Sequence, residues 1–200
     1  MQQTIYLMRH GETVWNRDGR FQGRRDSPLT PRGLDQARRA GATLARHISD
    51  RAVWTIVASP LGRALHTTAI VCRVLGIDPA RIETDARLSE IDVGDWAGLT
   101  EEDIEAASPG ALDGAGRDDW IFRSPGGESY EDVAGRVGAW LADAASHERL
   151  IVVAHGFTGR LLRSLYLGLP REIGLALEDP QDAIFRLSGG ASERIACADW

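Results

Sequence analysis

Two short apolar runs constrain this chain more than any other feature, because each of them ends in a histidine followed by a glycine. Residues 5–8 lead through an arginine to His10, and residues 150–154 lead directly to His155. Short runs of aliphatic residues are typical of strands that a sheet buries on both faces. In α/β proteins, functional side chains gather at the carboxyl ends of such strands. The sequence therefore predicts that the two histidines meet at one edge of a sheet.

Further strand and helix patterns alternate along the chain. Serine or threonine before proline is typical of a helix start, and glycine commonly follows a helix end. The expected elements are a helix from Thr30-Pro31, a strand over 53–58, a helix from Ser59-Pro60 to about 75, a helix that begins at a Ser129 and Asp132 capping box, a helix from 157 to about 167, and a last strand over 183–187 at a sheet edge. This order predicts an α/β three-layer sandwich in which helices flank a mostly parallel central sheet. The segment from 188 to Trp200 carries little signal for any strand or helix.

One segment has a different composition. Residues 101–127 contain seven acidic residues and two arginines, with several glycines in the middle. Long polar loops of this kind are usually lids or disordered insertions. Two hundred residues suit one domain. We therefore expect a single domain over 1–200, with a lid at about 101–127.

Charge and hydropathy exclude several classes of partner. The 23 arginines are outnumbered by 29 acidic residues, which gives a net charge of −6 and argues against a nucleic-acid partner. No apolar run approaches 18 residues, and the amino terminus lacks the pattern of a secretion signal, so we expect no membrane partner and a cytoplasmic protein. Two cysteines without paired spacing suggest neither a disulfide framework nor a zinc site.

The residues at the predicted strand and helix ends suit phosphate chemistry. His10 is nucleophilic and neutral near pH 7, and Arg9 offers a planar fork of donors that fits a phosphate. Arg63 falls in the first turn of a predicted helix, where a cation opposes the helix dipole unless an anion lies nearby. Each histidine could instead be a core residue or a metal ligand. The chain lacks a His-x-x-x-His pair and an aspartate cluster with ligand spacing, which argues against a metal.

A candidate acid lies further along the chain. Glu90 stands between the apolar residues Leu88 and Ile91, before a glycine-rich bend. A partly buried carboxyl group near a phosphate would have a raised pKa and could donate a proton at neutral pH. Local sequence alone also describes an ordinary surface carboxylate. We expect the helix starts to add N–H donors to the same phosphate site.

These motifs together resemble a known family. The runs 9–16, 20–23 and 26–30 resemble the start of the histidine phosphatase superfamily, the clan of cofactor-dependent phosphoglycerate mutases and related phosphatases. Residues 59–69 resemble its second motif, with His66 where glutamine is common, and residues 88–98 resemble its acid motif.

The resemblance implies a role for each candidate. His10 would form a phosphohistidine intermediate, while Glu90 would protonate the leaving oxygen and then help to activate water. No metal and no cofactor would be needed. The implied phosphate- and substrate-binding residues are Arg9, Asn16, Gln22, Gly23, Arg63 and His155.

Departures from the mutase pattern favour hydrolysis. Phosphoglycerate mutases carry a tyrosine three residues after the acid and a lysine further on, where this chain has Val93 and, near the lysine position, Glu101. No adjacent arginine pair occurs in 101–127, and Pro125-Gly126-Gly127-Glu128-Ser129 resembles the phosphatase branch. We predict a metal-independent phosphatase for small phosphorylated metabolites such as sugar phosphates, phosphoglycerate derivatives or ribazole phosphate. The alternatives are a cofactor-dependent phosphoglycerate mutase and a non-catalytic phosphate- or phosphoprotein-binding module. A homodimer is compatible with this fold.

Overall fold

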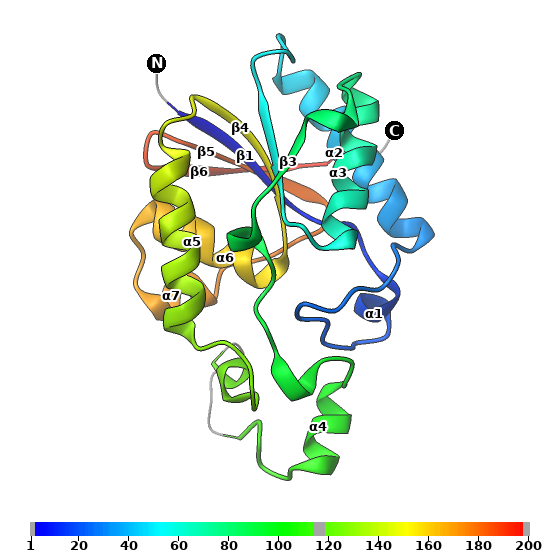
Figure 1. The fold of residues 1–200 in the computed structure, drawn as a ribbon, viewed down its shortest axis with the longest axis vertical. Coiled ribbons are helices and arrows are strands. Elements are labelled where there is room, and N and C mark those ends of the chain that lie inside the picture. The colour runs from blue at the N-terminus through cyan, green and yellow to red at the C-terminus, as the bar shows by residue number, and fades with distance from the viewer. Residues whose placement is uncertain (1–2, 114–118, 198–200) are drawn as a thin grey trace.

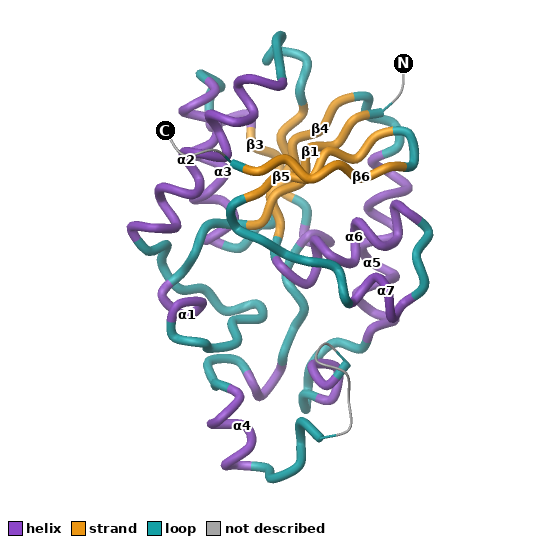
Figure 2. The backbone as a smooth tube through the Cα atoms, turned by 180° about the vertical axis from the view of Figure 1, so that it is seen from behind, coloured by secondary structure: helices purple, strands orange, loops and turns teal. Residues whose placement is uncertain are grey.

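A six-stranded sheet with helices on both faces forms the body of the molecule (Figures 1 and 2). The computed structural model describes residues 3–113 and 119–197. The strands are β1 (Thr4–Arg9), β2 (Thr55–Ala58), β3 (Ile82–Thr84), β4 (Arg149–Ala154), β5 (Ala183–Ser188) and β6 (Ala191–Ala196). Their order across the sheet is β3-β2-β4-β1-β5-β6; the first four are parallel, and β5 and β6 run antiparallel to their neighbours. The predicted three-layer α/β architecture is confirmed.

Helices cover the two faces of the sheet separately. The helices are α1 (Val14–Arg17), α2 (Pro31–His47), α3 (Gly62–Leu75), α4 (Glu101–Ala107), α5 (Tyr130–Ala144), α6 (Gly156–Leu167) and α7 (Arg171–Leu175). Alternate residues of β1 divide between two cores, because successive strand side chains point to opposite faces. Ile5 and Leu7 pack with residues of α5 and α6, whereas Tyr6 and Met8 pack with residues of α2 and α3. Each face of the sheet is thus a buried layer.

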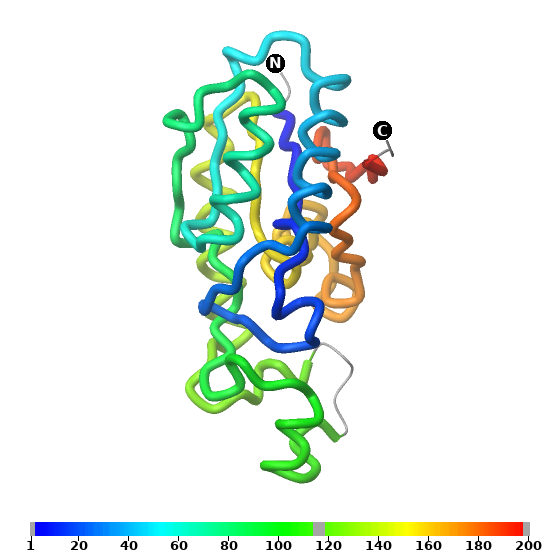
Figure 3. Tube along the Cα trace, turned by 90° about the vertical axis from the view of Figure 1, so that its right-hand side faces the viewer, coloured from blue at the N-terminus to red at the C-terminus, as the bar shows by residue number. Residues whose placement is uncertain are grey.

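The segment expected to be a lid has a small core of its own. It extends from one end of the body in Figures 1 and 3 and contains α4. Trp96, Ile104 and Trp120 are buried together there, and the rings of Trp96 and Trp120 lie 5.4 Å apart. Apolar packing therefore orders this acidic segment. Its part at 114–118 lies outside the described residues.

Helix starts follow the predicted capping at two sites and depart from it at a third. Thr30 accepts the Gly33 amide with Pro31 in the first turn, and Ser129 forms a capping box with Asp132, as predicted. The prediction for Ser59 is wrong, because α3 begins at Gly62 and has no side-chain cap. The hydroxyl of Ser59 is instead bonded to a histidine of the candidate site, described below.

Two strand predictions also need correction. Residues 183–187 were expected at a sheet edge, but β5 pairs with β1 on one side and with β6 on the other. The edge strand β6 was not predicted, because its sequence lacks an apolar run and none of its residues is buried. The strand expected over 53–58 begins at Thr55, since Trp54 turns into the core and Val53 is exposed. No helix among residues 3–113 and 119–197 combines the length and apolarity needed to cross a membrane.

The central strand offers a test of this packing. Ile151 on β4 is fully buried between β2 and β1. We expect Ile151→Ala to lower the free energy of unfolding by about 2–5 kcal/mol, since it leaves a cavity in a sheet covered on both faces. Ile173 on α7 is 54% exposed, so Ile173→Ala should change it by less than about 0.5 kcal/mol. Urea denaturation of both variants measures the difference, and similar losses would contradict this placement of the core.

Candidate active site

Parallel pairing of β1 with β4 brings the two histidines together. The register places Arg9 opposite Ala154, and the His10 amide donates to the Ala154 carbonyl at 3.1 Å. The rings of His10 and His155 then lie edge to face with centroids 5.1 Å apart. The predicted meeting of two strand ends is therefore present in the structure.

His10 is held as a neutral imidazole with a defined acceptor nitrogen. Its Nδ1 lies 2.8 Å from the carbonyl oxygen of Gly11, which only accepts, so Nδ1 carries the hydrogen. The lone pair of Nε2 is left, and Nε of Arg63 donates to it at 3.1 Å. Burial lowers the pKa of His10 well below its ordinary value, and the charges of His155, Arg9 and Arg63 lower it further. The ring is therefore neutral, and Nε2 carries the lone pair that a nucleophile needs.

Arg63 is the most completely bonded side chain of the site. Its guanidinium is buried, and it donates to the carbonyls of Gly23 at 2.8 Å and Arg25 at 2.7 Å besides His10. It also pairs with Asp26 at 2.8 Å. These bonds aim the charge of Arg63 at His10 and fix the loop that carries Gly23.

Carboxylates occupy the two helix starts that were expected to bind phosphate. The side chain of Asp26 accepts the amide of Gly62 at 2.7 Å and that of Arg63 at 3.2 Å, at the start of α3. Glu90 accepts the amides of Phe157 at 3.2 Å and Thr158 at 3.0 Å, at the start of α6. The expectation that these helix starts donate to phosphate is therefore wrong for these amides, because the chain supplies its own anions there.

The pKa expected for Glu90 also needs correction. Burial acts to raise the pKa of this carboxyl, as predicted. The charge of Arg63, the Thr158 amide, the charge of Arg9 and the Ile91 amide together outweigh burial, so the pKa is lowered from its ordinary value. Without a second anion beside it, Glu90 is a carboxylate at neutral pH.

Two buried polar atoms beside His10, one from His155 and one from Arg9, are placed to bind a ligand. His155 bonds through Nε2 to the hydroxyl of Ser59 at 2.7 Å, and its Nδ1 is buried without a hydrogen-bond partner in that part of the chain. Nε of Arg9 is likewise buried without a hydrogen-bond partner among the described residues. Burial, followed by the charges of Arg63, Arg9 and Arg136, lowers the pKa of His155 well below its ordinary value. Buried polar groups in native proteins are normally bonded, so these atoms indicate where a ligand would bind.

Arg9 is held in place by a carboxylate on the far side of the site. Its NH1 donates to the side chain of Asp179 at 2.8 Å and to the Asp179 carbonyl at 2.9 Å. Gly156 permits this approach, since a Cβ there would collide with Asp179 and lie 3.2 Å from the Arg9 guanidinium carbon. The glycine after His155 is thus required by the packing of Arg9.

The remaining candidates lie on the loop after β1. Asn16 lies in the short helix α1, where its side chain accepts the amide of the capping residue Thr13. It also accepts a hydrogen bond from Gln181 at 3.2 Å, and Gln181 donates to the His10 carbonyl at 3.2 Å. Gln22 accepts a hydrogen bond from Ser27 at 3.2 Å. Asn16, Gln22 and Gly23 all line the cavity in front of His10, as a role in substrate binding would require.

All predicted site residues except His155 line one cavity of about 590 Å³, and the His155 ring stands behind it against His10. The opposite wall comes from Trp120 and Ile121 of the acidic segment and from Phe21. Arg20, Arg160, Glu101 and Glu178 add charge around its rim. The cavity lining therefore combines the arginines beside His10 with aromatic and aliphatic side chains.

Sequence reasoning missed several contributors to this site. Asp26 lies in the run 26–30 that resembles the family, so the sequence did offer a signal for it. Ser59 was interpreted as a helix cap. Asp179 and Gln181 lie in an irregular segment before β5, where no sequence pattern marked them. Among residues 3–113 and 119–197, no three His, Cys, Asp or Glu side chains are grouped to hold a metal ion.

Comparison with known proteins identifies the family. The family model for the histidine phosphatase superfamily (branch 1) matches residues 5–192. This chain belongs to the histidine phosphatase superfamily. A similar curated relative is named probable phosphoglycerate mutase GpmB, from Salmonella choleraesuis; it is 38% identical over 177 residues, which cover 83% of this chain and 75% of the relative.

Solved structures of the superfamily share the whole fold. A mycobacterial glucosyl-3-phosphoglycerate phosphatase in complex with VO3 is 29% identical, with a TM-score of 0.79 over 98% of each chain. Bacillus stearothermophilus YhfR is 32% identical, with a TM-score of 0.77 over 97% of this chain and 96% of that one. The family resemblance seen in the sequence is thereby confirmed, and its members include proteins named as phosphatases and as a mutase.

The buried neutral histidines predict how stability depends on pH. An unfolded imidazole takes up a proton below about pH 6.5, whereas His10 and His155 resist protonation in the folded protein, so unfolding binds protons and stability falls as the pH falls. Between pH 7.5 and 5.5 we expect a loss of about 1 kcal/mol for each of the two histidines.

Urea denaturation of His155→Gln at both pH values measures one share of this loss. Its stability should fall less between pH 7.5 and 5.5 than that of the wild type. His66 is exposed on α3, and His66→Gln should keep the wild-type dependence. An unchanged dependence in His155→Gln would contradict a buried neutral histidine at that position.

Proposed function

We propose that this protein is a metal-independent phosphatase that hydrolyses small phosphomonoesters through a phosphohistidine at His10. The observation that carries the proposal is the unprotonated Nε2 of His10 beside Arg63, in a pocket where Arg9 and His155 each keep a buried polar atom for a ligand. A phosphoryl group in that pocket would meet a nucleophile and three groups that stabilise its negative charge.

The first step transfers the phosphoryl group to the enzyme. As the phosphoryl group binds, Nε of Arg63 gives up its hydrogen bond to Nε2 of His10 and donates to a phosphoryl oxygen instead. The lone pair of Nε2 then attacks phosphorus, the N–P bond forms, and the bond from phosphorus to the leaving oxygen breaks. The leaving alkoxide takes a proton from Glu90. This carboxyl is ionised in the ligand-free site, but a phosphate dianion beside it raises its pKa by like charge, so Glu90 takes up a proton from the solvent when the substrate binds.

The second step returns the site to its starting state. Glu90, now a carboxylate, accepts a proton from water as the water oxygen attacks the phosphohistidine. The N–P bond breaks, inorganic phosphate leaves, and His10 recovers its lone pair. Dividing one difficult displacement between two easier ones is the advantage of a covalent intermediate.

The outer cavity supports a phosphatase with an organic leaving group. Trp120, Ile121 and Phe21 provide a partly aromatic wall suited to a sugar or another ring. We propose that residues 101–127 act as the lid over this substrate, a small phosphorylated metabolite. Sugar phosphates, phosphoglycerate derivatives and ribazole phosphate are the first candidates.

Phosphoglycerate mutase is the second candidate function, favoured by the name of the 38% identical relative. Val93 and Glu101, at or near positions where mutases have tyrosine and lysine, both line the cavity. An apolar side chain and a carboxylate there give a second phosphate group, such as that of the bisphosphate, little support. Interconversion of 2- and 3-phosphoglycerate that requires the bisphosphate would establish the mutase instead.

The nucleophile is tested by phosphate release from p-nitrophenyl phosphate and a panel of metabolite phosphates, with and without a chelator. We expect release to survive chelation and to fall by about 10³-fold or more in His10→Ala, because the covalent route is lost. His66→Ala serves as the matched histidine control and should keep wild-type activity. Release by His10→Ala at the wild-type rate would rule out the mechanism. A non-catalytic phosphate-binding module would bind phosphate and release none.

The intermediate itself can be trapped. Quenching the enzyme during turnover of a labelled phosphomonoester should leave label on the protein that is stable in base and lost in acid, as expected for phosphohistidine. The label should be absent from His10→Ala. Label with the opposite stability would point to another attachment.

The acid role of Glu90 predicts a dependence on the leaving group. Glu90→Gln should lower kcat/KM for alkyl phosphates by about 10²–10⁴-fold, since their alkoxides need a proton. The loss for p-nitrophenyl phosphate should be much smaller, because p-nitrophenolate leaves without one. Steady-state kinetics on both substrates measures the difference, and equal losses would assign Glu90 another role.

A further inference from the structure

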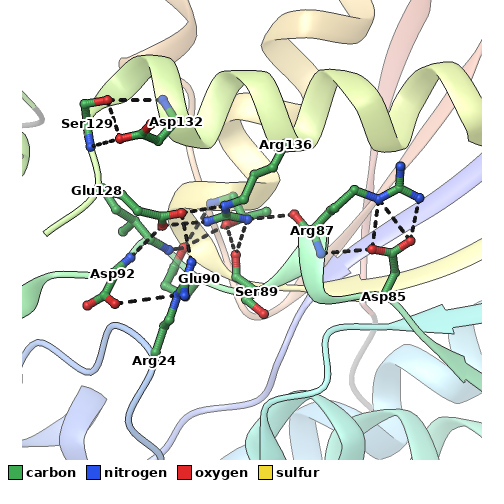
Figure 4. Close-up of polar contacts among 12 residues, drawn as sticks. Arg24, Asp85, Arg87, Ser89, Glu90, Asp92, Glu128, Ser129, Asp132 and Arg136 are labelled. Carbon is green, nitrogen blue, oxygen red and sulfur yellow. Dashed lines mark hydrogen bonds and ion pairs between the residues drawn. The ribbon is translucent and has the colours of Figure 1, made fainter.

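Four charged side chains surround the backbone that carries Glu90 (Figure 4). We call Arg24, Asp92, Glu128 and Arg136 the clamp. Arg136 of α5 and Glu128 form a two-pronged ion pair, with Nε to Oε1 at 2.9 Å and NH2 to Oε2 at 3.0 Å. Their side chains are only 14% and 15% exposed. A pair in this geometry is both strong and directional.

The clamp bonds the chain on both sides of Glu90. Before it, NH1 of Arg136 donates to the carbonyls of Arg87 at 2.6 Å and Ser89 at 2.8 Å. After it, Glu128 accepts the Asp92 amide at 2.8 Å, and its own amide donates to the Asp92 carbonyl at 2.9 Å. The Glu90 carboxylate itself accepts hydrogen bonds from the amides of Ile91, Phe157 and Thr158 and from the Thr158 hydroxyl. The clamp thus reaches Glu90 through the backbone.

Arg24 extends the clamp to the phosphate side of the cavity. Its NH2 donates to Glu128 at 2.9 Å, and its Nε lies 3.7 Å from Asp92. Arg24 directly follows Gly23, whose carbonyl accepts from Arg63. The Glu128 carboxylate therefore links the chain around Glu90, helix α5 and the loop whose carbonyls bind Arg63.

Stability alone gives a weak reason for such a cluster. A well-packed apolar set often replaces a buried ion pair without loss of stability. An apolar set could neither accept the Asp92 amide nor donate to two carbonyls. The geometry of these bonds supports a role in orienting the chain between residues 87 and 92.

We propose that Glu128 and Arg136 are positioning residues that hold Glu90 in register with the start of α6 and with the leaving oxygen. The proposal rests on the phosphatase function proposed above. Its variants are compared with the wild type on the same substrates. An inactive wild type would contradict the proposed function, whereas a changed preference between alkyl and aryl phosphates in the variants tests the clamp.

Leaving-group dependence separates positioning from a general structural role. Glu128→Gln and Arg136→Met should lower kcat/KM for an alkyl phosphate by about 10–100-fold, the usual effect of a group that orients a functional side chain. The loss for p-nitrophenyl phosphate should be less than about threefold, since its departure needs no proton. Arg136→Lys should give a smaller loss, because lysine keeps the charge without the fork.

The chain offers matched controls on the same segment. Arg87 pairs with Asp85 at 2.7 Å and with Asp143 at 2.6 Å through its side chain. Arg87→Met and Asp143→Asn change charge as the clamp variants do, but remove no bond to Ser89 or Asp92. They should keep wild-type activity on both substrates. Equal losses on the two substrates in the clamp variants, or the same selective loss in the controls, would overturn the proposal.

A second measurement does not depend on turnover. The pKa of Glu90 can be followed by carbon-13 NMR of labelled glutamate carboxyls, with the signal assigned by its absence in Glu90→Gln. Removing a negative charge by Glu128→Gln would by itself lower the pKa of another carboxyl, whereas loosening the bonds to Phe157 and Thr158 would raise it. We expect a rise. An unchanged or lowered pKa in the folded variant would overturn the positioning role, whether or not the wild type hydrolyses any substrate tested.

Discussion

The hydrogen bond from Arg63 to Nε2 of His10 is the interaction on which the rest of the candidate site depends. Arg63 can make it because the carbonyls of Gly23 and Arg25 and the carboxylate of Asp26 hold the other donors of a guanidinium that is buried. The same charge lowers the pKa of His10, together with burial, and opposes the effect of burial on the pKa of Glu90. One side chain thus orients the His10 ring, helps to keep it unprotonated and favours the ionised form of Glu90.

Carboxylates at both helix starts change how the site would recognise phosphate. Asp26 and Glu90 accept the first amides of α3 and α6, and Asp179 pairs with Arg9. The positive charge of the site is therefore largely balanced before substrate binds. Recognition of phosphate then depends on specific donor atoms such as Nε of Arg9 and Nδ1 of His155. A balanced site favours a ligand that fits these donors over anions in general, because a poorly fitted anion would meet carboxylates without gaining their bonds.

Sequence reasoning succeeded where the signal is local and periodic. The apolar runs before His10 and His155 predicted adjacent strand ends, and the register of β1 with β4 brings the histidines together. It failed where the deciding contact joins distant segments. Ser59 has the residue type of a cap, yet its hydroxyl bonds to His155, 96 positions further along. The pKa of Glu90 depends on amides of α6 that no pattern near residue 90 reveals. The strand β6 pairs with β5 along its length although its own sequence has no apolar run.

The position of Glu90 suits the two roles proposed for it, first as acid and then as base. Its bonds to Phe157 and Thr158 favour the ionised form, which suits the activation of water. A phosphoryl dianion held by Arg9 and Arg63 would use the cations that now lower the pKa of Glu90, and would add a like charge beside it. The pKa would then rise while the ester is intact and fall again when phosphate leaves. This exchange requires that the carboxylate stay in its place while its charge changes. Backbone bonds on both sides of Glu90 meet that requirement, because they do not titrate with the carboxyl they hold.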